Sequence, residues 1–529
     1  IGTSSPSATL EISSTSPAFS MRETDASDSF ELFEIGMSGG VINFNTRNSS
    51  NGFVSTDYQM GRNSSGASSH NFFIAGSAKF LIDTNSRISL SNNDSGTDNT
   101  VFGYTAGANI DAGSNYNVYI GHQAASSGTH NDAQMNTAIG YRSMFPLTSG
   151  DYNTALGSDS LRLITTGGSN VAVGSGAAYA LTTGDYNTAL GYRALYTEDV
   201  GRGTTAIGYH TLYSQNSDSN DENTYNTAVG FKAGYSTTTA TKVTYMGWEA
   251  GYYGTTGTAN TAVGYKALHQ NQKGYGNVAI GDEAGRYVTS SLNIAIGFSA
   301  GRGKESAPYN SGEGNISIGN YTNYDVSTGK FNVSIGGRAG YEIDTGESNT
   351  LIGNNAGYNI KDGVGTTILG GYAGRYSSGS RNTFIGYATG DGGTTSAPFS
   401  SGQYNTVVGA EAFDVFTTGD YNSIFGYQSG DAITTGNLNV AMGRSALGAE
   451  TIGISTVAIG DNAGSQQNFG SAAATGNVMV GSGAGFWNVT GTGNTYLGSS
   501  AGTGANGNSN NNNTGVGKSA LSAITTGDS

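Results

Sequence analysis

The sequence has 529 residues, of which 85 are glycine, 5 are proline and none is cysteine, and its formal net charge is −15. Without cysteine the chain has no disulfide, no thiolate metal site and no cysteine nucleophile. Its acidic balance argues against a nucleic-acid groove, which needs clustered Lys and Arg. Because no run of about 20 apolar residues occurs, we expect no membrane insertion in this segment. An apolar content of 36% in so long a chain indicates a thin, repetitive core.

Residues 1–98 alternate short β-type segments with turns rich in Gly, Ser and Asn. Such segments lie at 30–33, 41–44 and 80–82. We predict a small β domain here, leading into the following region through residues 87–90.

One phrase recurs over residues 99–529: Asn, then Thr or Val, a small or β-type residue, an aliphatic residue and Gly. It occurs 24 times, and 14 of the 23 intervals between successive repeat glycines, from Gly103 to Gly517, are 17 residues. Its strong positions are spaced by two and four residues, which is typical of strands and not of an amphipathic helix. We therefore predict an all-β, parallel β-solenoid of about 24 coils, each with a strand of about five residues, a second short strand and a Thr-Gly turn.

Four positions of the phrase have expected structural roles. The Asn should form a ladder of amides between coils, and the Gly should supply a positive φ at a corner. The aliphatic residue and the Ala three residues after the Gly should be structural as well. Representative residues are Asn136, Ile139, Gly140, Asn187, Leu190, Gly191, Ala194, Asn277, Ile280, Gly281, Ala284, Asn349, Ile352, Gly353 and Ala356.

The apolar surface of one coil is small compared with the conformational entropy lost when the coil is ordered. A core shared between chains would compensate for this. We therefore expect a homo-oligomer wound about a long axis and take a homotrimer as its form, although the spacing fixes neither the number three nor the handedness.

Three long intervals begin at Gly208, Gly297 and Gly386, 89 residues apart, and a fourth begins one coil early, at Gly460. They predict loops that leave the coils. One interpretation is duplication of a five-coil block with tolerated surface loops. The other makes the loops lateral contact sites for a partner, with the contact residues Pro308, Tyr309, Pro398 and Phe399.

No catalytic constellation is visible. The five histidines have no carboxylate pair at a recurring spacing, and the Gly-x-Gly strings open no helix. Asp residues after turn glycines, such as Asp151 and Asp420, are interpreted as caps of the following turn. The 32 tyrosines often follow a repeat glycine. They could stack on sugars, but we favour packing between chains. We predict no enzyme activity, no metal site and no cofactor.

The phrase Asn-Thr-Ala-Ile-Gly-Tyr-x-Ala resembles the head repeats of trimeric autotransporter adhesins, and the same type of repeat is found in tail fibres of tailed bacteriophages. The amino-acid sequence at residues 2–12 and 87–90 is more similar to that of the phage proteins. The resemblance implies a trimeric, left-handed parallel β-roll with one coil per repeat and the aliphatic residue inside.

On this basis we expect a rigid, non-enzymatic tail-fibre shaft, virion-borne or extracellular, that mediates host-cell attachment. Expected partners are two further copies of the chain, other fibre or virion proteins, and a host surface glycan or protein, but no nucleic acid. One alternative is a bacterial surface adhesin with the same rod, and a second is a fibre-borne polysaccharide depolymerase. We also expect the sequence to be a piece of a longer polypeptide.

Overall fold

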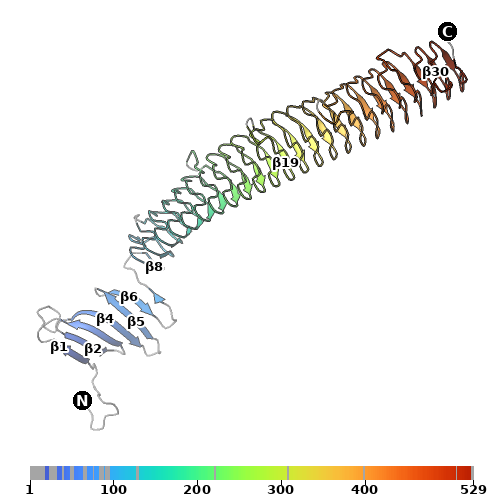
Figure 1. The fold of residues 1–529 in the computed structure, drawn as a ribbon. Coiled ribbons are helices and arrows are strands. Elements are labelled where there is room, and N and C mark those ends of the chain that lie inside the picture. The colour runs from blue at the N-terminus through green and yellow to red at the C-terminus, as the bar shows by residue number, and fades with distance from the viewer. Residues whose placement is uncertain are drawn as a thin grey trace, which may run out of the picture. The chain divides into compact units, whose positions relative to one another are not determined.

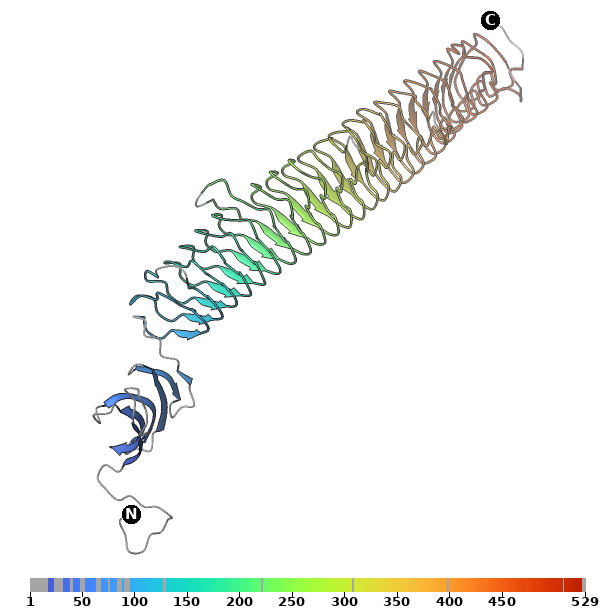
Figure 2. The same cartoon turned by 60° about the vertical axis from the view of Figure 1, so that its left-hand side comes forward.

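The fold is all-β in a computed structural model of the chain (Figures 1 and 2). The structure describes residues 18–22, 32–38, 41–47, 53–62, 68–74, 77–82, 88–89, 96–126, 130–219, 222–306, 309–396, 399–507 and 509–525. None of these residues is helical, so none belongs to a helix that could cross a membrane. The chain divides into two compact units, residues 1–183 and 184–529.

The first unit contains a seven-stranded antiparallel sheet in which each strand pairs with the next along the chain. The segment predicted as a lead-in, at 87–90, supplies the last strand of this sheet. The strands are β1 (Ala18–Arg22), β2 (Leu32–Ser38), β3 (Val41–Arg47), β4 (Phe53–Arg62), β5 (Ser68–Ile74), β6 (Ser77–Ile82) and β7 (Ile88–Ser89).

The first unit also contains five coils, each with one short strand. These strands pair in parallel, and each residue lies opposite the residue at the same place in the next repeat, as Thr137 lies opposite Thr154. The strands are β8 (Thr100–Phe102), β9 (Val118–Ile120), β10 (Thr137–Ile139), β11 (Thr154–Leu156) and β12 (Val171–Val173).

The second unit has its own parallel, in-register stacking, and Figure 1 shows its coils one above the next around β19. The predicted parallel β-solenoid with a period of about 17 residues is thus confirmed. The strands are β13 (Thr188–Leu190), β14 (Thr205–Ile207), β15 (Thr227–Val229), β16 (Thr244–Met246), β17 (Thr261–Val263), β18 (Val278–Ile280), β19 (Ile294–Ile296), β20 (Ile316–Ile318), β21 (Val333–Ile335), β22 (Thr350–Ile352), β23 (Thr367–Leu369), β24 (Thr383–Ile385), β25 (Thr406–Val408), β26 (Ser423–Phe425), β27 (Val440–Met442), β28 (Val457–Ile459), β29 (Val478–Val480), β30 (Thr495–Leu497) and β31 (Thr514–Val516).

The predicted second strand is wrong, and the first strand is shorter than expected. Each coil has a single three-residue strand, and turns form most of the remainder. The second and fourth residues after a repeat glycine have positive φ, for example 50° at Arg193 and 53° at Leu195. Because left-handed residues curl the chain tightly, no second extended segment follows the strand.

The resemblance placed the aliphatic residue of the phrase inside the solenoid, and this is also wrong. Leu190 and Ile280 point outward and remain 43% and 41% exposed, whereas the middle residue of each strand, such as Ala138, is fully buried. Alternation along a strand puts neighbouring side chains on opposite faces. The buried Asn and the middle residue share the inner face, so the aliphatic residue must lie on the outer one.

Core volumes are balanced between the middle strand residue and the residue four after the repeat glycine. Ala138 is combined with Met144, and both are fully buried. Where the middle residue is an aromatic ring, the partner position is small: it is Ala125 beside Tyr119 and Gly251 beside Tyr245, where a Cβ on the glycine would lie 2.6 Å from the ring. The interior therefore has little room for a second large side chain beside such a ring.

The predicted amide ladder is confirmed. The Asn332 side chain is fully buried. Its Nδ2 group donates to the side-chain oxygen Oδ1 of Asn315 at 3.1 Å and to the backbone carbonyl oxygen of Gly346 at 2.8 Å. Its own Oδ1 accepts from the backbone and side-chain nitrogens of Asn349, both at 3.0 Å. Where neighbouring coils both carry Asn, each amide thus satisfies a turn carbonyl group and the Asn of the adjacent coil, so the ladder fixes the stacking register.

The repeat glycines also form a ladder, because successive coils approach each other closely there. Gly264 has φ +135°, and a Cβ at this position would lie 2.3 Å from the carbonyl oxygen of Gly281. An L-residue is therefore excluded by both conformation and space. This explains why the glycine is invariant among the 24 copies in this sequence.

A buried carboxylate supports the long connection that follows β14. Glu198 is fully buried and accepts from the Gly201 backbone at 2.7 Å and from Gln215 Nε2 at 2.8 Å. The same arrangement recurs before the last long connection, where Glu450 accepts from Gln467 Nε2 at 2.9 Å. Both connections are thus anchored by a fully hydrogen-bonded carboxylate.

The long connections leave the coils and return to them, and the one between β14 and β15 projects from the stack in Figure 2. Those holding the predicted contact residues return through bridges at Asn310 and Ser400. Tyr309 stacks on Tyr287 at a ring distance of 5.8 Å, and Phe399 on Tyr376 at 6.5 Å. Pro308 and Pro398 lie outside the described residues.

Candidate functional site

The outward residues of the short strands form an uncharged surface in each unit, with one apolar row and one row of mostly β-branched residues. We call it the outer strand face and define it as the first and last residues of the three-residue strands β8–β12 and β13–β31. The first residue is Thr, Val, Ile or Ser, and the last is apolar in every strand. Last residues with 41–47% of their surface exposed are Leu156, Leu190, Met246, Ile280, Leu369, Met442 and Leu497.

The outer strand face carries no charged residue, although the chain has a net charge of −15. Tyrosines widen it on the side before some of the strands, where Tyr152, Tyr186 and Tyr421 are 58%, 69% and 54% exposed. Contiguous exposed apolar residues are typical of interaction surfaces.

The predicted structural residues occupy consistent places. The Asn and Ala residues are buried, the aliphatic residues lie in the outer strand face, and the glycines have positive φ. The structure thus brings them together as ladders and not as one compact site. The buried residues are Asn136, Asn187, Asn277, Asn349, Ala194, Ala284 and Ala356; the outward ones are Ile139, Leu190, Ile280 and Ile352; the glycines are Gly140, Gly191, Gly281 and Gly353.

Aromatic side chains line the turn that follows the strands β13–β16. We call this surface the aromatic edge and define it as the residues one, two and five after the repeat glycine in these four coils. Stacked rings one residue after the glycine have centroid distances of 5.5, 5.2 and 4.0 Å. Those five residues after it have distances of 5.2, 5.3 and 5.1 Å. The rings are Tyr192, Tyr209, Phe231 and Trp248 in the first row, and Tyr196, Tyr213, Tyr235 and Tyr252 in the second.

The rings of the aromatic edge stack on one another within one chain. Tyr196 and Tyr213 are inclined by only 1°, so each ring covers a face of its neighbour. Sugars bind aromatic residues through exposed ring faces, which the inner members of these rows do not offer. The sugar-stacking alternative therefore has little geometric support here, and packing between chains stays a prediction.

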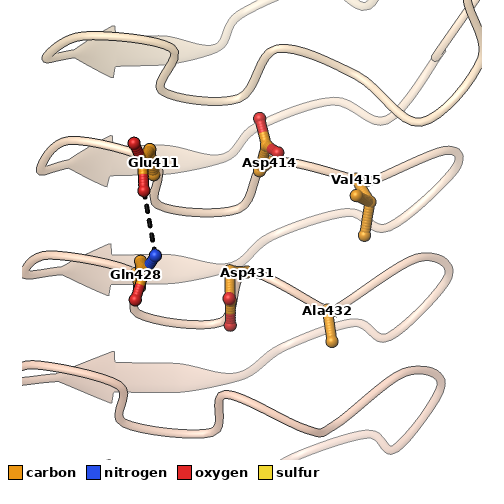
Figure 3. A pocket seen from close by; sticks show the side chains of 6 residues that line it. All are labelled: Glu411, Asp414, Val415, Gln428, Asp431 and Ala432. Carbon is orange, nitrogen blue, oxygen red and sulfur yellow. Dashed lines mark hydrogen bonds between the residues drawn. The ribbon is translucent and has the colours of Figure 1, made fainter.

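A cavity of about 290 Å³ lies between the coils of β25 and β26 (Figure 3). Glu411 and Asp414 line it from one coil and Asp431 from the next, and Gln428 donates to Glu411 at 2.9 Å. Burial, and then the charges of Asp391 and Glu411, raise the pKa of Asp414 above its ordinary value. Burial likewise raises the pKa of Asp431.

The sequence reasoning missed this carboxylate group because it searched for pairs near histidines. The signal was present: aligned on their repeat glycines, three consecutive coils carry Asp at the same position, as Asp391, Asp414 and Asp431. Among the described residues no group of three or more His, Asp or Glu side chains is arranged to hold a metal ion.

The Asp residues after turn glycines act differently from the prediction. Asp151 accepts a hydrogen bond from the Gln134 backbone at 2.7 Å, and Asp420 accepts one from the Gln403 backbone at 2.6 Å. Both donors lie in the preceding coil. These carboxylates therefore connect neighbouring coils and do not cap the turn that follows them.

Comparison with protein-family models, with curated proteins and with solved structures gives no match.

Proposed function

We propose that this chain forms the shaft of a homotrimeric, non-enzymatic fibre that is exposed outside the cell or on a virion and serves in host-cell attachment. The observation that carries the proposal is the outer strand face. It is uncharged, its last-residue row is apolar in every coil, and burying the aliphatic side chains of that row would stabilise an assembly by about 25 cal/mol per Å² of apolar surface.

Parallel copies of the same chain are the occupants that fit this face best. Each copy has the same coil spacing, so aliphatic residues can meet in register over many coils. Because the face is uncharged, association there brings no like charges into direct contact. The number three, the tail-fibre setting and the role in attachment rest on the resemblance of the repeat phrase, and a bacterial surface adhesin remains the first alternative.

Sedimentation analysis of the full chain tests the assembly. We expect a trimer for the unmodified protein and dissociation when Leu190, Ile280 and Leu369 are each replaced by Lys, because this puts charges into the interface. Gln272→Lys, at an exposed turn outside the face, adds the same kind of charge and should leave the trimer intact. A monomeric unmodified protein would refute the proposed assembly.

The cavity lined by Glu411, Asp414 and Asp431 is the observation that favours the depolymerase alternative, because glycosidases use pairs of carboxyl groups. We expect the purified protein to release no reducing sugar from capsular or lipopolysaccharide extracts. Release that disappears in both Asp414→Asn and Asp431→Asn would instead establish the enzyme.

A further inference from the structure

Two cations of the aromatic edge are held in place by the rings around them. The Arg193 guanidinium carbon lies 5.1 and 5.2 Å from the ring centroids of Tyr192 and Tyr196. The Lys232 ammonium lies 5.3 and 5.6 Å from those of Phe231 and Tyr235. Cation–π attraction restricts both side chains, so a bound anion would immobilise little additional side-chain freedom.

These two positive charges have no carboxylate partner. In the part of the chain that the structure describes, neither Arg193 nor Lys232 forms an ion pair, whereas Lys266, the next cation in the row, lies 3.7 Å from Glu249. His210 lies in the coil between them and stacks on Tyr209 at 4.1 Å. Burial, and then the charges of Arg193 and Lys232, lower the pKa of His210. Glu249, which holds the same position in the last coil of the edge, pairs with Lys266 outside it, so Arg193 and Lys232 give this part of the edge a local positive charge on an otherwise acidic chain.

The geometry narrows the chemistry of a ligand. Bases and neutral sugars recognised by stacking need free ring faces, and the inner rings of both rows are covered by their neighbours. What the edge presents is a pair of cations beside rows of phenol groups. Coils rise by about 4.8 Å each, so Arg193 and Lys232, two coils apart, belong to a linear pattern with a spacing of about 10 Å.

We propose that the part of the aromatic edge around Arg193 and Lys232 binds a linear anionic polysaccharide, whose carboxylates meet these two cations while its hydroxyl groups meet tyrosine hydroxyls. An extended sugar chain running along the coils can present carboxylates at this interval. The inference rests on the proposed role in attachment for its biological setting, and it names the ligand class and the binding surface.

Biolayer interferometry on the assembled full-length protein tests the inference with three immobilised probes: alginate, which is a polyuronate, neutral dextran, and single-stranded poly-dT. We expect binding to alginate that weakens with added salt, and no binding to dextran or poly-dT. Arg193→Gln combined with Lys232→Gln should weaken alginate binding at least about tenfold, because two charge-assisted contacts are lost.

Lys330→Gln combined with Arg444→Gln is the matched control. It removes the same net charge from two cations that already pair with Glu347 and Asp461, and it should bind alginate as the unmodified protein does. Equal binding by the Arg193/Lys232 variant, or binding to dextran or poly-dT as tight as to alginate, would overturn the inference.

Sedimentation separates this inference from the proposed function. A trimer that does not bind alginate refutes the binding surface and leaves the fibre proposal standing. A monomer that binds alginate through Arg193 and Lys232 refutes the fibre and leaves the surface standing. The double variant must sediment as the unmodified protein does, so that weaker binding reports the lost charges and not lost folding.

Discussion

The amide ladder gives a sharp test of how neighbouring coils hold each other. Replacing Asn332 by Val removes four hydrogen bonds, two donated by its side chain and two accepted by it. Valine should fit, because Val243 occupies the equivalent place in another coil and is fully buried. In that coil the carbonyl group of Gly257, which lies where Gly346 lies here, accepts from the amide of Asn260 at 3.0 Å.

The chain itself therefore shows how the loss is partly compensated. In Asn332→Val the side-chain amide of Asn349 can turn to the Gly346 carbonyl group, but the Asn349 backbone N–H keeps no acceptor. One unsatisfied buried N–H costs about 1–3 kcal/mol. A local opening equilibrium shifts tenfold for about every 1.4 kcal/mol, so amide exchange around Asn349 should accelerate by about 5- to 150-fold.

Hydrogen–deuterium exchange with peptides covering residues 344–352 is the appropriate assay. Asn354→Val is the control, because Asn354 is exposed and its side chain bonds, among the residues that the structure describes, only to the adjacent Asn355 side chain. Unchanged exchange in Asn332→Val, or equal acceleration in the control, would show that the ladder does not stabilise the stack. The reciprocal change, Val243→Asn, should slow exchange in the following coil.

Three further changes have expected outcomes. Gly251→Ala should destabilise its coil by about 1–3 kcal/mol more than Gly483→Ala, since both glycines have φ above +60° but only the first Cβ meets Tyr245; exchange rates compare the two. The pKa of Asp414 is raised in the folded state, so the folded protein favours the protonated carboxyl group. The stability linked to this protonation is fully present below the ordinary pKa of 3.8 and is lost as the pH rises through the raised value. Asp414→Asn should therefore stabilise its coil at pH 7, by less than about 1 kcal/mol because the group is half-exposed, and not at pH 3 in denaturant titrations. Glu198→Gln can keep an oxygen where the Gly201 backbone donates to Oε1, but it puts a donor opposite the Gln215 Nε2 group that donates to Oε2, so exchange in the adjoining connection should accelerate as expected for about 1–3 kcal/mol.

The sequence was sufficient to predict the solenoid architecture because the same motif recurs in all 24 coils. The period predicted the coils, and the recurring Asn predicted the amide ladder, which is observed around Asn332. Both inferences depend on residues with few structural uses at a fixed spacing, namely a buried amide and a glycine with positive φ.

The direction of the aliphatic residue could not be derived in the same way. Ile is more apolar than Ala, so hydrophobicity alone places Ile139 inside and ignores the width of the core. Ala138 is inside because Met144 already fills the narrow coil. The carboxylates around Asp414 were missed for a related reason: residues 17 apart are neighbours only in a stack with this period.

The in-register stacking also bears on how such a chain can change in length. Most ladder Asn residues and the repeat glycines contact their equivalents one coil away, as Asn332 contacts Asn315 and Asn349. A coil gained or lost by unequal recombination between similar DNA repeats would therefore find matching neighbours on both sides. The length of the solenoid can therefore change in steps of about 4.8 Å while the cross-section of each coil stays the same. Variation in the number of coils should be tolerated far more readily than substitution at a ladder position.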